Sequence, residues 1–381
     1  MLSLKNFTYT LPEELIAHSP AARRDESRLL VFDKNKGEVA GHRRFFELGE
    51  VLEQLSPTPL MIVRNKSAVI PARLKGHKID GAGRAGKETE ILLARQQDCS
   101  SKIVWECLTR PRLKEGERVV FGPENASDSF VAECKKNVGY TRLISFERKD
   151  KNNRKDSLDD FYRWVNKMGC TPLPPYIKSD KKEDELRELY QTVYADKKAA
   201  GSVAAPTAGL HFTDELLARL GEKYPIVDLT LHVGLGTFLG VKETDIAKHQ
   251  MHAEAYSLSE ETAREINEHK ARGGEILAIG TTTTRVLESC WDEKNKCLTA
   301  GEGETDIFIY PPYKFRAVDH LLTNFHLSES TLLMLIAALT SRPNVASDFE
   351  TFPKSPIGRA YRQAIANKYR FFSFGDAMLI W

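Results

Sequence analysis

Two kinds of strand pattern follow each other along this chain. Between Arg73 and Phe146 the sequence repeats short strand-like segments, separated by Gly, Pro and charged turns: ETEILLARQ, KIVWECLTR, RVVFGP, DSFVAECKK and YTRLISFER. From Phe161 onward, strand-like and helix-like segments alternate. Short, regularly spaced strands are typical of a barrel or sandwich, whereas alternating strands and helices favour an open α/β sheet. We therefore expect an α/β main domain with an inserted small antiparallel β-barrel domain.

The expected limits of the insert come from composition. Residues Lys149–Asp160, KDKNNRKDSLDD, are charged and unpatterned, as a domain edge usually is. A chain of 381 residues also exceeds one average core. We expect a discontinuous α/β domain formed by residues 1–70 and 156–381, and a barrel domain formed by residues 71–155.

The charge divides between these parts. Arg73–Lys155 holds 19 Lys and Arg against 12 Asp and Glu, whereas the remainder holds 36 against 41. A basic insert on a mildly acidic host suits contact with nucleic-acid phosphates. An ordinary solvated surface would explain the same charges.

Several classes of protein are disfavoured by composition. The hydrophobic content of 41% and the charged content of 28% are typical of a globular protein. The longest apolar run, Leu332–Leu339, is far shorter than the roughly 20 residues of a membrane span, so we expect no membrane contact. The N-terminal residues resemble no targeting signal, so we expect a cytoplasmic protein. Six scattered cysteines form no C-x-x-C pair, and HQMHAE at His249–Glu254 is no H-E-x-x-H motif, so we expect no metal.

The segment Gly201–Thr213, GSVAAPTAGLHFT, combines small residues with a histidine. Small residues allow a backbone to approach a ligand, Gly209 has conformational freedom, and His211 titrates near neutral pH. The same segment also fits a tight connection from a strand to a helix that Thr213 caps.

Polar side chains also follow several expected strands. In GTTTTRVLES, glycine and hydroxyl groups lead from a strand into a helix N-terminus, a good position for a polar or anionic ligand. Open α/β sheets bind ligands at the carboxyl ends of their strands, so an enzyme pocket is the leading hypothesis and a pure binding module the weaker one. The junction residues are His211, Thr237, Thr281, Thr282, Arg285, Asn324 and His326.

Long strings along the chain occur in the order of a known family. They are AVIPARL (68–74), PLPPYI (172–177), YQTVYA (190–195), GSVAAPTAGLHFT (201–213), LHVGLGTF (231–238), HQMHAE (249–254), GTTTTRVLES (280–289), TDIFIYPPYKFRAVDHLLTNFHL (305–327) and YRFFSFGDAMLI (369–380). With these strings the chain resembles the S-adenosylmethionine:tRNA ribosyltransferase-isomerases of queuosine biosynthesis.

The resemblance implies an unusual reaction. The ribosyl moiety of S-adenosylmethionine would be transferred to 7-aminomethyl-7-deazaguanine (preQ1) at the wobble position of tRNA and isomerised, giving epoxyqueuosine-tRNA, adenine and methionine. S-adenosylmethionine would be a consumed substrate, so no cofactor is expected. The expected partners are S-adenosylmethionine and tRNA carrying preQ1, and the protein is expected to be a monomer.

The chemistry of this reaction suggests roles for side chains. A base must remove a proton beside the sulfonium, and the candidates are His211, His252 and Glu254, of which His211 is favoured because its segment is the most ligand-like. Arg285 would bind the carboxylate of the methionyl part and Asp376 its amine. The expected substrate-binding residues are Thr207, Gly209, Thr237, Gly280, Thr281, Thr282, Arg285, Asn324, His326 and Asp376. We expect tRNA contacts at Asn65 and Arg73.

Two other functions fit parts of the sequence. An RNA methyltransferase that uses S-adenosylmethionine would need a glycine-rich loop after the first α/β strand, and the G-x-G of LHVGLGTF is incomplete. A non-catalytic RNA-binding protein would have no reason to place His, Arg and Thr at several strand ends. The mass change on the RNA separates the three hypotheses.

Overall fold

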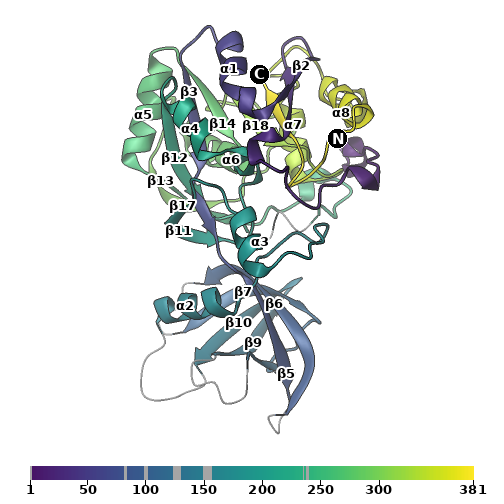
Figure 1. Ribbon diagram of the computed structural model, residues 1–381, viewed down its shortest axis with the longest axis vertical. Helices are drawn as coiled ribbons and strands as arrows, with labels where there is room; N and C mark the ends of the chain where they lie inside the picture. The colour runs from purple at the N-terminus through teal and green to yellow at the C-terminus, as the bar shows by residue number, and fades with distance from the viewer. Residues whose placement is uncertain are drawn as a thin grey trace. The chain divides into compact units, whose positions relative to one another are not determined.

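The chain folds into two compact units, shown in the computed structural model of Figure 1. The structure describes residues 2–80, 84–97, 102–122, 130–148, 157–234, 236 and 240–381. The first unit comprises Met1–Ala68, Pro174–Asp180 and Gln191–Trp381, and the second comprises Val69–Leu173 and Lys181–Tyr190. None of the helices in the described ranges has the length and apolar character that a membrane crossing requires.

The first unit is built on a nine-stranded mixed sheet. Its strand order is β17 (Gly301–Thr305), β13 (Glu254–Leu258), β12 (Ile226–Leu231), β3 (Leu60–Asn65), β14 (Glu275–Ile279), β18 (His320–Asn324), β19 (Ala377–Ile380), β1 (Arg28–Asp33) and β2 (Glu38–Arg44). The central strands β12, β3, β14 and β18 pair in parallel. Strand β19 lies antiparallel to β18 and parallel to β1. The carboxyl ends of the four parallel strands therefore meet at one edge of the sheet.

Alternate residues of the central strands enter two different cores. Ile276 and Ala278 of β14 belong to one core, and Leu277 and Ile279 belong to the other. Strands buried on both faces read as continuous apolar runs, which explains the EILAI sequence of β14.

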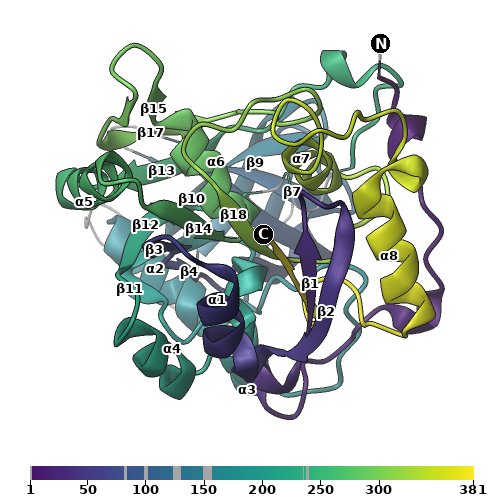
Figure 2. The same cartoon turned by 90° about the horizontal axis from the view of Figure 1, so that it is seen from above.

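Helices cover both faces of this sheet. The first core holds apolar residues of α5 (Glu260–Ala271), α6 (Thr281–Ser289), α7 (Thr331–Leu339) and α8 (Pro356–Ala366). The second core holds those of α1 (Leu48–Leu55) and α4 (Asp214–Gly221). Figure 2 shows α6 and α7 on one side of the strands and α1 and α4 on the other.

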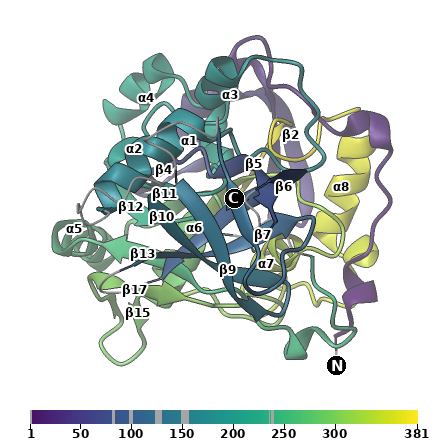
Figure 3. The ribbon, with the colours of Figure 1, turned by 90° about the horizontal axis from the view of Figure 1, so that it is seen from below.

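The second unit contains a closed antiparallel barrel, seen from below in Figure 3. Its strands are β5 (Arg73–Ile79), β6 (Ala85–Gln97), β7 (Ile103–Arg110), β8 (Arg118–Val120), β9 (Phe130–Val138) and β10 (Thr141–Arg148), in the order β10-β7-β6-β5-β8-β9. In β7 the residues Ile103, Trp105 and Cys107 are buried and alternate with more exposed ones, as the period of a strand requires. The expected fold class, an α/β domain with an inserted antiparallel barrel, is confirmed.

The barrel unit extends beyond residue 155, where the sequence indicated its end. Helix α2 (Leu158–Met168) and helix α3 (Glu183–Leu189) belong to it. The reason is aromatic packing: the Phe161 ring lies 5.5 Å from that of Phe130 and 4.9 Å from that of Phe146, between ring centroids. The unit therefore includes the helix that completes its core, beyond the boundary expected from the sequence.

Candidate active site

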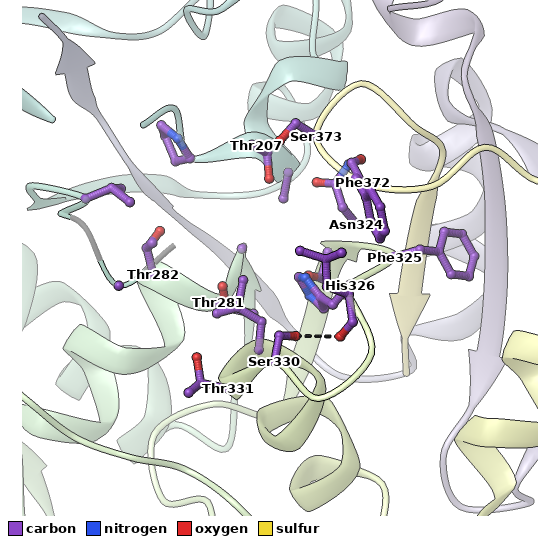
Figure 4. Close-up of a pocket in the computed structure, with 18 of the residues that line it drawn as sticks. Thr207, Thr281, Thr282, Asn324, Phe325, His326, Ser330, Thr331, Phe372 and Ser373 are labelled. Carbon is purple, nitrogen blue, oxygen red and sulfur yellow. Dashed lines mark hydrogen bonds between the residues drawn. The ribbon is translucent and has the colours of Figure 1, made fainter. Parts of the chain in front are cut away.

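A cavity of about 280 Å³ lies in the first unit (Figure 4). This volume is near the lower end of small-molecule sites, which hold roughly 300–1,000 Å³. The lining comes from residues 205–208, 280–282, 323–332 and 372–373, with Tyr176, Val233, Gly236, Gly240, Val241, Met251, Glu254 and Arg285. Because β14 ends at Ile279 and β18 at Asn324, the cavity lies at the carboxyl ends of parallel strands, as the sequence predicted.

The N-terminus of α6 forms one wall. Gly280 is its N-cap residue and has φ 86°, a conformation that disfavours a side chain. Thr281 and Thr282 line the cavity, whereas the Thr283 hydroxyl donates to the Ile279 carbonyl at 2.7 Å inside the helix. The first N–H groups of a helix have no intrahelical partners and carry partial positive charge. This wall therefore suits a polar or anionic group of a ligand.

Glu254 and Arg285 form a buried ion pair on the cavity wall. The other Glu254 oxygen accepts a hydrogen bond from the Gly234 amide at 2.8 Å. Arg285 also donates to the carbonyls of Thr305 at 3.2 Å and Ile307 at 3.4 Å. The Arg285 charge is therefore compensated by Glu254, whereas the sequence suggested that Arg285 binds the carboxylate of a ligand.

His211 lies behind the cavity wall and is not among the lining residues. Its Nδ1 lies 2.8 Å from the Ser27 hydroxyl, and its Nε2 lies 3.1 Å from the amide nitrogen of Asn324. Burial, aided by the charges of Arg370 and Arg24, lowers the pKa of His211 to about 3. Because the ring lies behind the lining residues, the expected role of His211 as the base that touches substrate does not agree with its position.

His326 does line the cavity. Burial lowers the pKa of His326 to about 3, so the ring is neutral at physiological pH. Its Nε2 lies 2.8 Å from the Thr323 hydroxyl, and its backbone N–H donates to the Tyr361 hydroxyl at 3.0 Å. These contacts hold a neutral imidazole in the wall beside Asn324.

Two other expected substrate contacts, Thr207 and Gly209, belong to the segment Gly201–Thr213 but differ in their surroundings. Thr207 lines the cavity, whereas Gly209, two residues on, does not. A Cβ at position 209 would lie 2.0 Å from the Tyr194 hydroxyl, so this glycine is required by packing and not by a ligand. Thr237 lies outside the described residues.

Asp376 and His252 also lie apart from the cavity lining. The Asp376 carboxylate is buried and accepts hydrogen bonds from the backbone amides of Arg28 at 2.9 Å and Arg370 at 2.8 Å, so it connects two segments of the fold. His252 is exposed, in a loop before β13 and not on a helix with His249. Neither position supports the substrate or base role suggested by the sequence.

The two residues expected to contact tRNA have different surroundings. Asn65 is fully buried, and its amide oxygen accepts from the backbone N–H groups of Ser67 and Leu231, both at 3.0 Å. Its amide nitrogen donates to Leu231 and to Thr282, so it connects β3, β12 and α6 and is not available to RNA. Arg73 is half-buried in the barrel unit and pairs with Glu90 at 3.6 Å.

Two aromatic side chains of the cavity were not expected from the sequence. Tyr176 and Phe372 line it with ring centroids 5.0 Å apart, and the Tyr176 hydroxyl lies 2.7 Å from that of Ser373. Phe372 has φ 71°, which is uncommon for a bulky residue and can mark a functional site. Both lie in strings that carry the family resemblance, PLPPYI and YRFFSFGD, and that was the available signal.

The described ranges contain no group of three or more His, Cys, Asp or Glu side chains arranged to hold a metal ion. The described cysteines, Cys107, Cys134, Cys170, Cys290 and Cys297, are free thiols.

Comparison with known proteins extends over the whole chain. A family model described as queuosine biosynthesis protein matches residues 4–380. A curated relative from Halothermothrix orenii, named S-adenosylmethionine:tRNA ribosyltransferase-isomerase, is 44% identical over 383 residues, and the match covers 100% of each chain. The crystal structure of an S-adenosylmethionine tRNA ribosyltransferase from Thermotoga maritima is 32% identical, with coverage of 99% of this chain and 100% of that chain and a TM-score of 0.48.

Proposed function

Because the chain belongs to the family of queuosine biosynthesis proteins, we propose that it is an S-adenosylmethionine:tRNA ribosyltransferase-isomerase. It transfers the ribosyl moiety of S-adenosylmethionine to the aminomethyl group of preQ1 at the wobble position of tRNA and isomerises it. The products are epoxyqueuosine-tRNA, adenine and methionine. The observation that carries the proposal is the 44% identity along the full length of both chains, which includes every segment of the cavity wall.

The cavity is the proposed site for S-adenosylmethionine. It combines a helix N-terminus at Thr281, hydroxyl groups of Thr207 and Thr282, and the aromatic rings of Tyr176 and Phe372. A ligand with a flat base, a ribose and a charged amino-acid part needs apolar and polar walls of this kind. The reaction takes place in the cytoplasm, where tRNA is available.

The proposed proton acceptor is Glu254. The reaction begins with removal of a proton from the carbon beside the sulfonium, because the positive sulfur stabilises the carbanion that forms. Of the three acceptors suggested by the sequence, Glu254 is the one whose side chain lines the cavity. A Glu254→Gln variant should lose turnover, and a melting curve separates this loss from unfolding, because the substitution also removes the charge that pairs with Arg285. Turnover at the wild-type rate would exclude this role.

The barrel unit is the proposed contact for tRNA phosphates. Among its described residues, the exposed basic side chains are Lys75, Arg84, Lys87, Arg95, Lys102, Arg110, Arg112, Lys114, Arg118, Lys135, Lys136, Arg163, Lys167, Lys181 and Lys182. Tyr140, 53% exposed at the β9–β10 turn, has the Arg112 guanidinium 5.7 Å from its ring centroid. An exposed ring beside cations is a common platform for an unpaired base.

The direct test is incubation of the full chain with S-adenosylmethionine and tRNA that carries preQ1, followed by mass spectrometry of the nucleosides. Epoxyqueuosine with equimolar adenine and methionine is the expected result. A methyl group on the RNA would support the methyltransferase hypothesis. Unmodified RNA with intact S-adenosylmethionine would leave only RNA binding.

A further inference from the structure

Asn324, the last residue of β18, has an unsatisfied acceptor in the cavity wall. The residue lines the cavity and is 2% exposed. No hydrogen-bond donor among the described residues reaches its Oδ1. Buried amide oxygens nearly always have a partner, because desolvation without one costs free energy. A ligand bound in the cavity would supply such a donor.

The orientation of this amide follows from its other contacts. The Asn324 nitrogen lies 3.1 Å from the Phe372 carbonyl oxygen and 3.1 Å from His211 Nε2. A carbonyl oxygen only accepts hydrogen bonds, so the group that faces Phe372 must be the NH₂. Its two N–H bonds are then both used inside the protein, and Oδ1 is the atom left for a ligand.

His211 holds the amide in this orientation. Because Nε2 accepts from Asn324, the ring proton is on Nδ1 and is donated to the Ser27 hydroxyl at 2.8 Å. The ring also stacks on Phe45, with centroids 5.0 Å apart. A flipped Asn324 would place Oδ1 against the Nε2 lone pair and the Phe372 carbonyl, and both contacts would be repulsive.

The Phe372 backbone completes the arrangement. Phe372 has a left-handed backbone conformation. Its carbonyl oxygen accepts one hydrogen bond from the Asn324 side chain and another, at 2.9 Å, from the Gly375 amide. Its ring lines the cavity beside Tyr176. Figure 4 shows Asn324 next to Phe372, with Thr207 beside Ser373 and Thr282 on the opposite side of the view. A neutral acceptor beside two aromatic rings suits a flat uncharged ring with an amino group, whereas an ammonium group would prefer the carboxylates of Glu254 or Glu329, which also line the cavity.

We propose that Asn324 Oδ1 accepts a hydrogen bond from the exocyclic amino group of a bound purine, the adenine of S-adenosylmethionine, and that His211 is a positioning residue for this contact. This inference rests on the proposed function. The adenine, which leaves during the reaction, would thus be recognised by the cavity wall at the end of β18.

The wild-type protein tests the inference without any substitution. Binding of 5′-methylthioadenosine, which has no methionyl ammonium, is measured by calorimetry and compared with its analogue that carries hydrogen in place of the 6-amino group. We expect the analogue to bind roughly tenfold more weakly, because it leaves Oδ1 unpaired. Equal affinities would overturn the inference and leave the proposed function standing. Binding of neither nucleoside would overturn the inference, whereas the proposed function is decided separately by the formation of epoxyqueuosine, adenine and methionine.

Variants test the positioning role. Asn324→Ala should abolish the preference for the amino group. His211→Phe keeps a ring on Phe45 but removes the acceptor, and should reduce the preference, whereas His211→Gln retains an acceptor for the Asn324 amide and should preserve it. The ratio of the two affinities is insensitive to a general loss of stability, and melting curves identify any unfolded variant. A full preference in His211→Phe would overturn the role of His211.

Discussion

At the scale of single residues, the buried histidines are held neutral. Burial lowers the pKa of His211 and His326 from 6.5 to about 3, and that of His320 to about 4. The Lys34 charge adds to the effect at His320. None of the three carries a charge at pH 7, so their roles are those of neutral donors and acceptors.

The neutrality of His211 predicts a pH dependence of stability. The unfolded chain binds a proton near pH 6.5, whereas the folded protein binds it only near pH 3. Stability is therefore complete above pH 6.5 and falls as the pH decreases toward 3. Lowering the pH from 7 to 5 should reduce the thermal midpoint of the wild type more than that of His211→Gln, whose side chain does not titrate. Equal reductions in scanning calorimetry would contradict the low pKa.

Gly209 provides a second prediction at this scale. A Cβ there would lie 2.0 Å from the Tyr194 hydroxyl and 2.8 Å from the Thr192 methyl group. Gly209→Ala should reduce the free energy of unfolding by about 1–3 kcal/mol. Addition of Tyr194→Phe, which removes the clashing hydroxyl, should restore part of this loss in urea denaturation. Gly49→Ala is the control, because its Cβ would meet only Leu220, at 3.7 Å. If both glycine variants behaved alike, the clash would not be the cause.

At the scale of elements, the cavity depends on how α6 is attached to the sheet. The Glu254–Arg285 ion pair joins the first residue of β13 to the middle of α6. Arg285 also donates a hydrogen bond to the carbonyl of Thr305, the last residue of β17, at 3.2 Å. Asn65 joins β3 to the first turn of the same helix through Thr282, at 3.3 Å. The position of the helix N-terminus is thus determined by side chains from neighbouring strands.

This attachment predicts a large effect of one substitution. Glu254→Ala would leave the buried Arg285 without its carboxylate, and should cost about 3–5 kcal/mol in urea denaturation. The control is Glu350→Gln, which breaks the Lys354–Glu350 pair, whose side chains are 71% and 70% exposed. Its loss should stay below about 1 kcal/mol. Comparable losses would show that the buried pair does not stabilise the attachment.

At the scale of the whole molecule, the two units have different proposed ligands. The cavity residues all belong to the first unit, and the exposed basic and aromatic residues of the proposed RNA contact belong to the second. Small-molecule binding and RNA binding should therefore respond to different substitutions.

This separation is testable with tRNA. Each of Arg112→Ala and Lys136→Ala should weaken tRNA binding and reduce the slope of log affinity against log salt by about 0.7–0.9. Binding of 5′-methylthioadenosine should not change. Lys294→Ala, an exposed lysine of the first unit, is the control and should leave the slope unaltered. An unchanged slope in the barrel variants would exclude these side chains as phosphate contacts.

Much of the fold could be predicted from local pattern. The alternation in KIVWECLTR identifies a barrel strand, and the start of α6 at Thr281 follows from a glycine after a buried strand. Thr213 caps α4, as expected, through the Leu216 amide. Residues at strand ends were located in the same way, because strand polarity alone places Thr281 and Asn324 at one edge of the sheet.

The sequence by itself therefore determined the elements, their order and the family. Only the tertiary structure decided which side chains meet and which way they face. His211 and Asn324 are 113 residues apart, and Glu254 and Arg285 are 31 residues apart. The periodicity of a helix or strand relates only residues close in sequence, so it does not predict these contacts. Gly209 shows the same limit, because the distant Tyr194 side chain leaves no room for a Cβ there. The periodicity of the sequence indicates which face of a helix or strand is buried. Which residues contact that face depends on how distant segments of the chain pack together.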